Sequence, residues 1–561
     1  MKDASIITKD ARTTRTNRNF EKIKKATLRR GFFCLYFSPN LSKKTPTFAL
    51  SKFKTMKVRN TLIFILILFA VIAGVMAVFP KDGIRIGENF VLHCPSFSDF
   101  LPSSAKEEST VNLDSLLSNQ IDIDNEIPQK AQAKLKDMPE YEEQPDPTSD
   151  NVVNDDASNY NIEEIKSAVN PLEFPAGNNT ALDHFFRKLS HHGEYEKIRV
   201  LHYGDSQLEG DRITAYIRYK LQGRFGGNGV GMCSPVAIYS QYSMKQSASE
   251  GWIRCPGFGK RDPAVTHRKY GPMMAFNRFS PIRDSLWERP EEPYKAWISF
   301  TKSSMGYGNT RKFKNVYIYY GNCTEEVNVT VKVGGAVVNE GRMPISEGLN
   351  VYAYKSPDYI SDVTLEFEAF DSPDFYCVSL EDDHGIIVDN IAMRGCSGEV
   401  FTGTDRSLLS ASYSKLGADL FILQFGANAV PNTKDSKGAT YFVNLFMSQV
   451  RTIRAMCPEA SIMIVGPNDM SVKNKDVYES YPILDTMVNM LRDAAERNNC
   501  AFWDTYKAMG GRNSMPKWVE ADPPLAAKDY THFSPQGAQV ISNMLYNAII
   551  VEYTNYLQRN K

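Results

Sequence analysis

The sequence lacks an excess of charge of either sign and lacks any regular spacing of its cysteines. Its 561 residues include 65 Lys and Arg and 65 Asp and Glu, so the formal net charge is zero. A nucleic-acid partner requires a basic face, and this composition gives no support for one. The nine cysteines are scattered, with no C-x-x-C pair and no zinc spacing. We therefore expect no metal site.

One long apolar run is present near the N-terminus. Thr61–Phe79 is almost continuously apolar and is followed by Pro80. This is close to the ~20 residues that cross a bilayer as a helix. Lys57 and Arg59 precede it, which predicts a cytoplasmic N-terminus and export of the rest. A cleaved signal peptide is the alternative. Because no A-x-A site or lipobox cysteine follows, we expect a single-pass anchor in the inner membrane, with the rest in the periplasm.

The segments on either side of this run have biased compositions. Residues 1–60 are basic, and the first 55 are consistent with a misassigned start, so we assign them no role. Residues 80–170 are expected to be an exported linker. From about residue 102 this linker is acidic and rich in Ser, Asn, Asp, Glu and Pro. Such a composition buries too little apolar surface to offset the entropy of ordering, which predicts disorder.

Two stretches of the exported part, 171–250 and 384–561, alternate strand and helix patterns. Apolar runs that predict buried strands lie at 198–203, 386–393, 419–425, 461–466 and 501–503. Apolar residues at helical spacing predict helices at about 181–189, 211–224, 440–456, 482–498 and 535–552. Strands alternating with helices predict an α/β fold with a parallel sheet covered on both faces.

The stretch between them, residues 251–383, has a different pattern. Short runs of alternating polarity occur at 296–300, 316–320, 327–333 and 363–369, separated by Gly, Asn, Pro and Asp. This pattern is typical of a β-sandwich or jelly roll, which here would interrupt the α/β domain. Cys323 and Cys377 both lie in this stretch. Their spacing leaves open whether they pair.

Four short polar motifs follow predicted strands or lie on loops that can reach the same sheet edge. They are Gly204-Asp205-Ser206, Gly395-Cys396-Ser397-Gly398, Gly426-Ala427-Asn428 and Asp529-Tyr530-Thr531-His532. Open α/β folds place their chemistry at this edge. A serine hydroxyl needs a base to become a nucleophile, and the base needs an orienting carboxylate. We expect Ser206 to be the nucleophile, His532 the base and Asp529 the orienting carboxylate.

The same motifs offer donors for the oxyanion of a tetrahedral intermediate. We expect these donors to be the backbone N–H groups of Ser206 and Gly398 and the side-chain amide of Asn428. Two alternatives stay open at this point. Gly395 competes with Gly398, and Asp469 in Gly466-Pro467-Asn468-Asp469 competes with Asp529.

Together the four motifs resemble those of the SGNH/GDSL-type serine hydrolases, named for a Ser, Gly, Asn and His in four blocks. Ser206, Gly398, Asn428 and His532 match these positions, and Asp529-x-x-His532 matches the closing motif of the family. Two departures are Gln207, where the name-giving motif has leucine, and Ala429, where an acidic residue is common. The β-rich stretch resembles the carbohydrate-binding-like module inserted in peptidoglycan O-acetylesterases of this superfamily.

This resemblance implies a serine esterase that needs no cofactor, and the apolar run 61–79 predicts that it is anchored in the membrane. Its substrate would be an acylated glycan of the cell envelope or an imported one, and the acyl group would be acetyl. Two other classes are compatible with the same residues: a glycan O-acetyltransferase using the same site, and a glycan-binding envelope protein with a vestigial hydrolase fold. The sequence does not indicate the oligomeric state.

Overall fold

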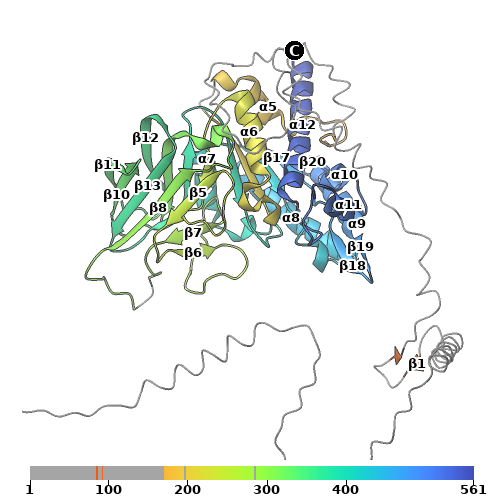
Figure 1. Ribbon diagram of the computed structural model, residues 1–561, viewed down its shortest axis with the longest axis horizontal. Helices are drawn as coiled ribbons and strands as arrows, with labels where there is room; N and C mark the ends of the chain where they lie inside the picture. The colour runs from red at the N-terminus through yellow and green to blue at the C-terminus, as the bar shows by residue number, and fades with distance from the viewer. Residues whose placement is uncertain (1–83, 86–90, 93–169, 195–196, 284–285) are drawn as a thin grey trace, which may run out of the picture. The chain divides into compact units, whose positions relative to one another are not determined.

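The computed structural model describes residues 84–85, 91–92, 170–194, 197–283 and 286–561 (Figure 1). The predicted segments 1–60 and 61–79 and nearly all of the linker 80–170 lie outside these residues. Within the described part, no helix combines the length and the apolar character that a membrane span needs. Strands β1 (Ile84–Arg85) and β2 (Val91–Leu92) form an antiparallel pair. They belong to a separate unit from the one that contains residues 107–561.

A parallel sheet of five strands organises the second unit. Its spatial order is β15-β3-β16-β17-β20, and every neighbouring pair in it is parallel. The strands are β3 (Lys197–Gly204), β15 (Gly385–Ala392), β16 (Ala418–Gln424), β17 (Ser461–Val465) and β20 (Ala501–Trp503). The first strand in the chain, β3, lies between β15 and β16, so the strand order reverses there. Open α/β sheets bind ligands at the carboxyl ends of the strands beside such a reversal.

Helices cover both faces of this sheet, as the α/β pattern predicts. They are α5 (Asp183–Ser190), α6 (Thr214–Phe225), α7 (Arg406–Leu416), α8 (Ser436–Met456), α9 (Leu484–Arg497), α10 (Thr505–Ala508), α11 (Ser514–Glu520) and α12 (Pro535–Arg559). Ile198 and Val200 of β3 share a core with α5, α6, α11 and α12. Leu201 and Tyr203 point to the opposite face and share a core with α7, α8 and α9. This alternation within one strand is the expected consequence of its two-residue period.

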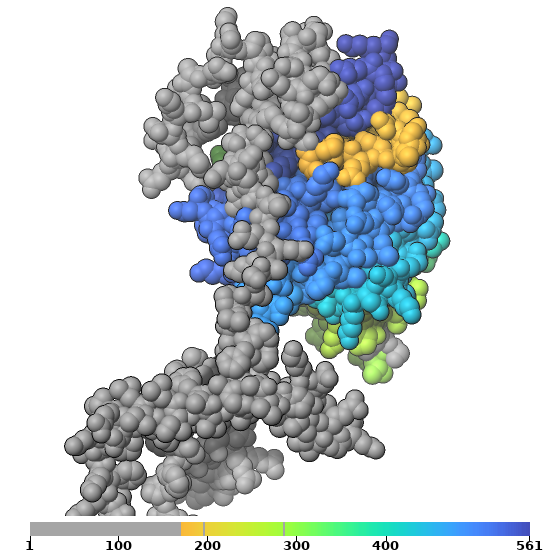
Figure 2. Space-filling view, turned by 90° about the vertical axis from the view of Figure 1, so that its right-hand side faces the viewer, coloured from red at the N-terminus to blue at the C-terminus, as the bar shows by residue number. Residues whose placement is uncertain are grey.

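The last helix is longer than the predicted 535–552. Ser534 caps its N-terminus by accepting a hydrogen bond from the Gly537 N–H, and Pro535 occupies the first turn. At the other end, Tyr553 and Tyr556 pack on Phe186 of α5, so the apolar face continues beyond the predicted end. The space-filling view shows the first described residues of this unit beside the end of α12 (Figure 2).

Residues between α6 and β15 form two antiparallel sheets, on the left in Figure 1. One has the order β11-β10-β13-β8-β5, and the other has the order β12-β9-β14-β7-β6 with β4 also paired to β14. Their strands are β4 (Gly231–Cys233), β5 (Met244–Ala248), β6 (Ile253–Pro256), β7 (Ala275–Arg278), β8 (Tyr294–Lys302), β9 (Phe313–Gly321), β10 (Val327–Val333), β11 (Ala336–Met343), β12 (Asn350–Ile360), β13 (Asp362–Ala369) and β14 (Asp374–Glu381). Buried side chains from both sheets form one core.

The predicted boundary at residue 251 differs from the strand pattern. Strands β4 and β5 precede it, because β4 pairs with β14 and β5 pairs with β8. The sequence 231–248 carries little alternation, so these edge strands were assigned to the α/β part. Cys323 and Cys377, whose pairing the sequence left open, are both free thiols.

A buried ion cluster joins β3 to β14 and β15. The Arg199 guanidinium contacts Asp389 at 2.7 Å and Glu381 at 2.7 Å, and it donates to Ser379 Oγ at 2.9 Å. Arg199, Glu381 and Asp389 are each at most 2% exposed. Burial alone would raise the pKa of Glu381, but the charges of Arg199 and Lys197 outweigh this effect and lower it. The cluster ties the parallel sheet to the antiparallel part.

Candidate active site

The strand β3 ends in a tight turn that exposes a serine at the carboxyl edge of the sheet. A Cβ on Gly204 would lie 2.7 Å from a Leu208 methyl and 2.9 Å from the Gln424 carbonyl oxygen, so only glycine fits there. Asp205 caps the following 3₁₀ helix η4 (Ser206–Asp211) by accepting the Gln207 N–H at 2.9 Å. Ser206 is thus the first residue of that helix. Its backbone N–H has no partner within the helix.

Asp205 itself is buried, and within the described structure it forms no hydrogen bond with His532. Burial raises its pKa to about 6, against the opposing effects of the Gln207 N–H and the nearby His532. Its hydrogen bond to the Gln207 N–H fixes the turn. We therefore interpret Asp205 as a structural residue of the turn.

The helix predicted from Asp211 begins later. Gly210 has a φ of 74° and Asp211 a φ of 67°, which are left-handed conformations that interrupt a helix. The regular helix α6 starts at Thr214. The short helix η4 therefore stands between the serine and α6, and it forms one wall of the site.

Asp529 and His532 lie on the loop before α12, opposite Ser206. Asp529 Oδ1 accepts the backbone N–H groups of Thr531 and His532, each at 3.0 Å. Its Oδ2 lies 2.7 Å from His532 Nδ1. Burial alone would raise the pKa of Asp529, but the hydrogen bonds from the backbone and the imidazole of His532 outweigh burial and lower it. The carboxylate is therefore charged at neutral pH.

The other imidazole nitrogen faces the serine. Ser206 Oγ lies 2.7 Å from His532 Nε2. Because the Asp529 carboxylate can only accept, Nδ1 carries the proton and Nε2 accepts the serine hydroxyl. The side chains of His532 and Asp529 are 30% and 51% exposed, so the group is open to solvent on the histidine side. The structure thus brings together the three residues that the sequence predicts as nucleophile, base and orienting carboxylate.

Gly398 and Asn428 lie beyond the ends of β15 and β16. Asn428 Nδ2 donates to the Cys396 carbonyl at 3.2 Å, which joins the two motifs. Gly398 has a φ of 88°, and a Cβ there would lie 2.9 Å from the rings of Phe425 and Phe446. Gly395 also has a positive φ, but no atom lies within 4 Å of a Cβ placed there. Close packing therefore restricts position 398 to glycine more strongly than position 395.

The rival carboxylate Asp469 belongs to a different network. It accepts hydrogen bonds from Ser480 Oγ at 2.5 Å, from the Met515 N–H at 2.8 Å and from Ser514 Oγ at 3.3 Å. It is fully buried, and burial raises its pKa to about 6. These contacts hold β19 (Val477–Ser480) to α11, so Asp469 does not orient His532.

Two buried amides that the sequence analysis passed over hold the histidine loop in place. Gln207 Nε2 donates to the Thr531 carbonyl at 2.8 Å and to Asn468 Oδ1 at 3.0 Å, and its Oε1 accepts the Phe533 N–H at 3.4 Å. Asn468 Nδ2 donates to the same Thr531 carbonyl at 2.9 Å. Both amides are at most 3% exposed. Gln207 was noted only as a departure from leucine, although a polar residue beside a buried turn was a signal for such a bond.

Comparison with known proteins adds a family and a fold. Residues 366–540 match the GDSL-like lipase/acylhydrolase family. This segment contains Gly398, Asn428, Asp529 and His532 but not Ser206. None of the curated proteins compared with the chain matches it.

Several solved structures are similar to this chain. A peptidoglycan O-acetylesterase is 22% identical with a TM-score of 0.52, over 70% of this chain and 99% of its own. An acetyl xylan esterase is 17% identical with a TM-score of 0.23, over 29% of this chain and 80% of its own. A family two carbohydrate esterase from Cellvibrio japonicus is 10% identical with a TM-score of 0.21, over 56% and 99%. Only the first score is high enough to support a shared fold.

The family match runs from β13 into α12, and the structural match covers 70% of this chain. Residues 366–540 therefore match the GDSL-like lipase/acylhydrolase family, within a fold similar to that of a peptidoglycan O-acetylesterase.

Proposed function

We propose that this protein removes O-acetyl groups from a glycan of the cell envelope or from an imported glycan, by a Ser-His-Asp mechanism. The observation that carries the mechanism is the continuous chain of two 2.7 Å contacts from Ser206 Oγ through His532 to Asp529. The choice of a glycan is supported by the fold shared with a peptidoglycan O-acetylesterase.

In the first half of the reaction, Ser206 Oγ attacks the ester carbonyl as its proton moves to His532 Nε2. Asp529 stabilises the imidazolium through Nδ1–H. The oxyanion accepts hydrogen bonds from the N–H groups of Ser206 and Gly398 and from the Asn428 amide. Collapse breaks the bond between the carbonyl carbon and the glycan oxygen, and this alkoxide takes the proton from Nε2.

In the second half, water attacks the acetyl-Ser206 ester. His532 Nε2 takes a proton from the water and returns it to Ser206 Oγ as acetate leaves. The partly exposed imidazole is compatible with entry of this water. If a sugar hydroxyl took the place of water, the same steps would transfer the acetyl group to a glycan.

The test measures acetate released from O-acetylated peptidoglycan and from acetylated xylan by the full-length protein. We expect Ser206→Ala to lower the rate at least about 10³-fold, since removal of a triad member leaves only the oxyanion donors and binding. Ser410→Ala serves as the matched control, because Ser410 lies on α7, where its Oγ donates to the Met456 carbonyl at 3.4 Å and not to His532. Wild-type rates in Ser206→Ala would refute the mechanism. Serine-dependent cleavage of an aryl acetate alone would refute the glycan assignment.

We also propose that the predicted helix 61–79 anchors the protein in the inner membrane, with the hydrolase domain in the periplasm. The support is the apolar run with Lys57 and Arg59 before it. Fractionation of cells, followed by protease treatment of spheroplasts, tests this topology. We expect the hydrolase domain to be in the membrane fraction and cleaved from outside; recovery in the cytosol would contradict the proposal.

A further inference from the structure

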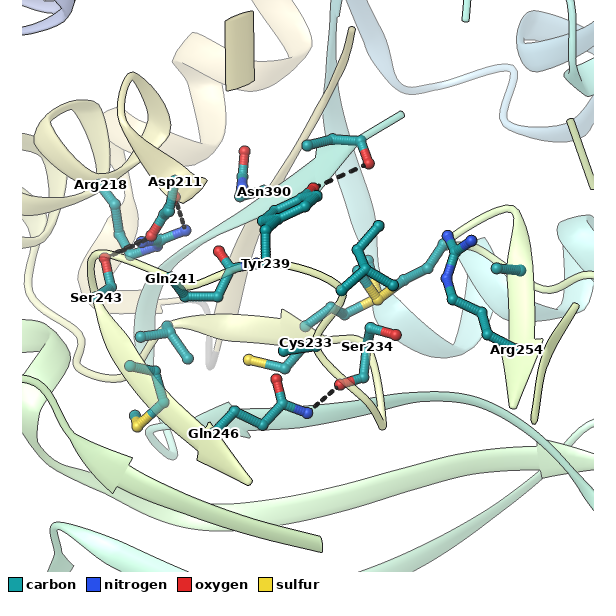
Figure 3. Close-up of a pocket in the computed structure, with 18 residues that line it drawn as sticks. Asp211, Arg218, Cys233, Ser234, Tyr239, Gln241, Ser243, Gln246, Arg254 and Asn390 are labelled. Atoms are coloured by element: carbon teal, nitrogen blue, oxygen red, sulfur yellow. Dashed lines mark hydrogen bonds and ion pairs between the residues drawn. The ribbon is translucent and has the colours of Figure 1, made fainter. Parts of the chain in front are cut away.

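A pocket lies between the end of β15 and the antiparallel sheets (Figure 3). It encloses about 60 Å³, which is room for a small group of a ligand and its water. Its walls come from β4, β5, β6, β7 and β15, from the loop 234–243, from the end of η4 and from α6. Most of its lining is apolar, so the few polar groups decide what it can bind.

The pocket wall includes the end of β15, which is the neighbour of β3 in the parallel sheet. Ala392, in its wall, pairs with Gly204 on the adjacent strand, two residues before Ser206. Tyr242 N–H donates to the Gly210 carbonyl at 2.8 Å, which fixes the pocket loop to the short helix that begins at Ser206. Because β15 and β3 are neighbouring strands ~4.8 Å apart, we expect a sugar ring bound at Ser206 to extend a substituent toward the pocket.

One of the two arginines in the wall is already neutralised. Arg218 contacts Asp211 at 2.7 Å, and Asp211 also accepts from Ser243 Oγ at 2.5 Å. Figure 3 shows these three side chains turned toward one another. This pair is satisfied within the protein and needs nothing from a ligand.

The second arginine, Arg254 of β6, has no counter-charge among the residues that the structure describes. Its Nε is buried and makes no hydrogen bond. Burial lowers its pKa, and the groups that oppose this effect are Tyr239 and Cys255 rather than a carboxylate. Figure 3 shows its guanidinium apart from the other labelled side chains of the pocket. Burying an unpaired charge is costly, so a ligand anion would be stabilised here.

Tyr239 also lines the pocket and interacts electrostatically with this arginine. Its hydroxyl is 3.5 Å from the Ala392 carbonyl, and burial raises its pKa to about 12, so it remains a neutral hydroxyl. Arg254 also lies 5.9 Å from the ring of Phe258, which leaves the planar fork of the guanidinium free to take an anion side-on. Such a fork matches the two oxygens of a carboxylate.

We propose that this pocket binds a carboxylate of the glycan substrate through Arg254, so that the enzyme acts on acidic glycans. The proposal rests on the esterase function proposed above. The carboxylate can belong to a uronic acid or to the lactyl ether of a muramic acid. What the two have in common, and what Arg254 would bind, is the carboxylate group. If Arg254 binds the carboxylate and Ser206 attacks the ester, these two residues fix where the acidic group lies relative to the ester on the glycan.

The test compares inhibition of aryl acetate hydrolysis by two pairs of sugars, using the full-length protein. N-acetylmuramic acid is paired with N-acetylglucosamine, and galacturonic acid with galactose, so each pair differs in a carboxylate-bearing group. We expect at least one acid to inhibit about tenfold more strongly than its neutral partner. The acid that does so identifies the source of the carboxylate.

The variant Arg254→Gln should remove most of this preference, and Arg254→Lys should retain part of it. Arg261→Gln is the matched control, since Arg261 also lies over an aromatic ring, Tyr270, but does not line the pocket. A preference that survives in Arg254→Gln, or an absence of preference in the wild type, would overturn the proposal. If Arg254→Gln does not fold, loss of the wild-type preference in high salt gives the same test, and a salt-independent preference overturns it. A wild type without serine-dependent ester hydrolysis would instead contradict the esterase function.

Discussion

Asp529 lies three residues before His532, and Asp469 follows Asn468, which holds the histidine loop, yet of these two carboxylates only Asp529 contacts the imidazole. We predict that Asp529→Asn lowers kcat about 10²- to 10⁴-fold, because the amide favours the wrong tautomer of His532. Asp469→Asn should leave kcat within a few-fold of the wild type. Steady-state kinetics on an aryl acetate would show this difference. A larger loss in Asp469→Asn than in Asp529→Asn would contradict the assignment.

The buried carboxyl of Asp469 also makes a pH-dependent contribution to stability. Burial raises the pKa of Asp469 to about 6, above its value in the unfolded chain. The native state then binds more protons than the unfolded state between about pH 4 and 6, so the contribution of Asp469 to stability decreases as pH rises through this range. We expect Asp469→Asn to flatten this part of the profile. Urea unfolding at several pH values measures it, and an unchanged slope would argue against the raised pKa.

Gln207 is a positioning residue, since it reaches the reaction only through the loop of His532. We predict that Gln207→Leu, which restores the residue common in the family, lowers kcat about 10- to 100-fold with little change in KM. Its hydrogen bonds to the Thr531 carbonyl and the Phe533 N–H would be lost, and the imidazole would be less well held.

Gln449→Leu is the matched control for this prediction. Gln449 is also a buried glutamine, and its side chain forms hydrogen bonds with Thr402. These bonds do not involve the histidine loop. Both variants should lose stability, while only Gln207→Leu should lose kcat. Equal kcat losses in the two would show that Gln207 acts through stability alone.

At the scale of elements, β3 is the strand that joins the parts of the fold. It supplies the turn of Ser206 at its carboxyl end and Arg199 near its start. The sequence predicted this strand within a residue at each end because it is apolar and fully buried between β15 and β16. Arg199 was the exception within that run. A charged residue in a buried strand signals a partner, but the partner strands, β14 and β15, lie some 180 residues later in the chain.

We predict that Arg199→Met destabilises the protein by about 3–5 kcal/mol, because it leaves Asp389 and Glu381 buried without their cation. The urea midpoint should fall, while kcat at a temperature where the variant is folded should be close to that of the wild type. Arg342→Met is the control, since Arg342 forms only an exposed ion pair with Glu326. A shift of the midpoint no larger than in Arg342→Met would contradict the role of this cluster.

The loops were harder to predict than the strands. The backbone of Gly210 and Asp211 turns into the left-handed region, and nothing in the local sequence except the glycine indicates this. The Asp529-x-x-His532 spacing predicted the contact with the imidazole correctly, because both residues lie on one short loop. Gln207 beside a buried turn signals a hydrogen bond, but its partner and that of Asn468 lie hundreds or tens of residues away, so no local pattern could identify the partner.

At the scale of the whole molecule, the antiparallel sheets share a core with the α/β part. Tyr319, Tyr376 and Cys377 pack in the same cluster as Leu201 and Tyr203 of β3. The alternating pattern of a strand predicts which of its faces is buried, but it does not predict which other element packs on that face. The sequence therefore did not indicate this shared core. The inserted domain of the prediction therefore has an extensive apolar contact with its host.

This shared core predicts cooperative unfolding of the described part that follows residue 170. We expect calorimetry and tryptophan fluorescence to report one coincident transition, because Trp252 lies in the antiparallel part and Trp503 and Trp518 lie in the α/β part. Two separated transitions would show that the antiparallel sheets fold independently of the hydrolase core.

The nucleophilic role of Ser206 can be measured directly by labelling the full-length protein with a fluorophosphonate, which forms a covalent bond with an activated serine. Peptide mapping by mass spectrometry should find the adduct on Ser206 in the wild type and none in Ser206→Ala. Labelling in His532→Ala should be slower by orders of magnitude, since the serine loses its base. An unmodified Ser206 in folded protein that still cleaves an ester would contradict the proposed mechanism.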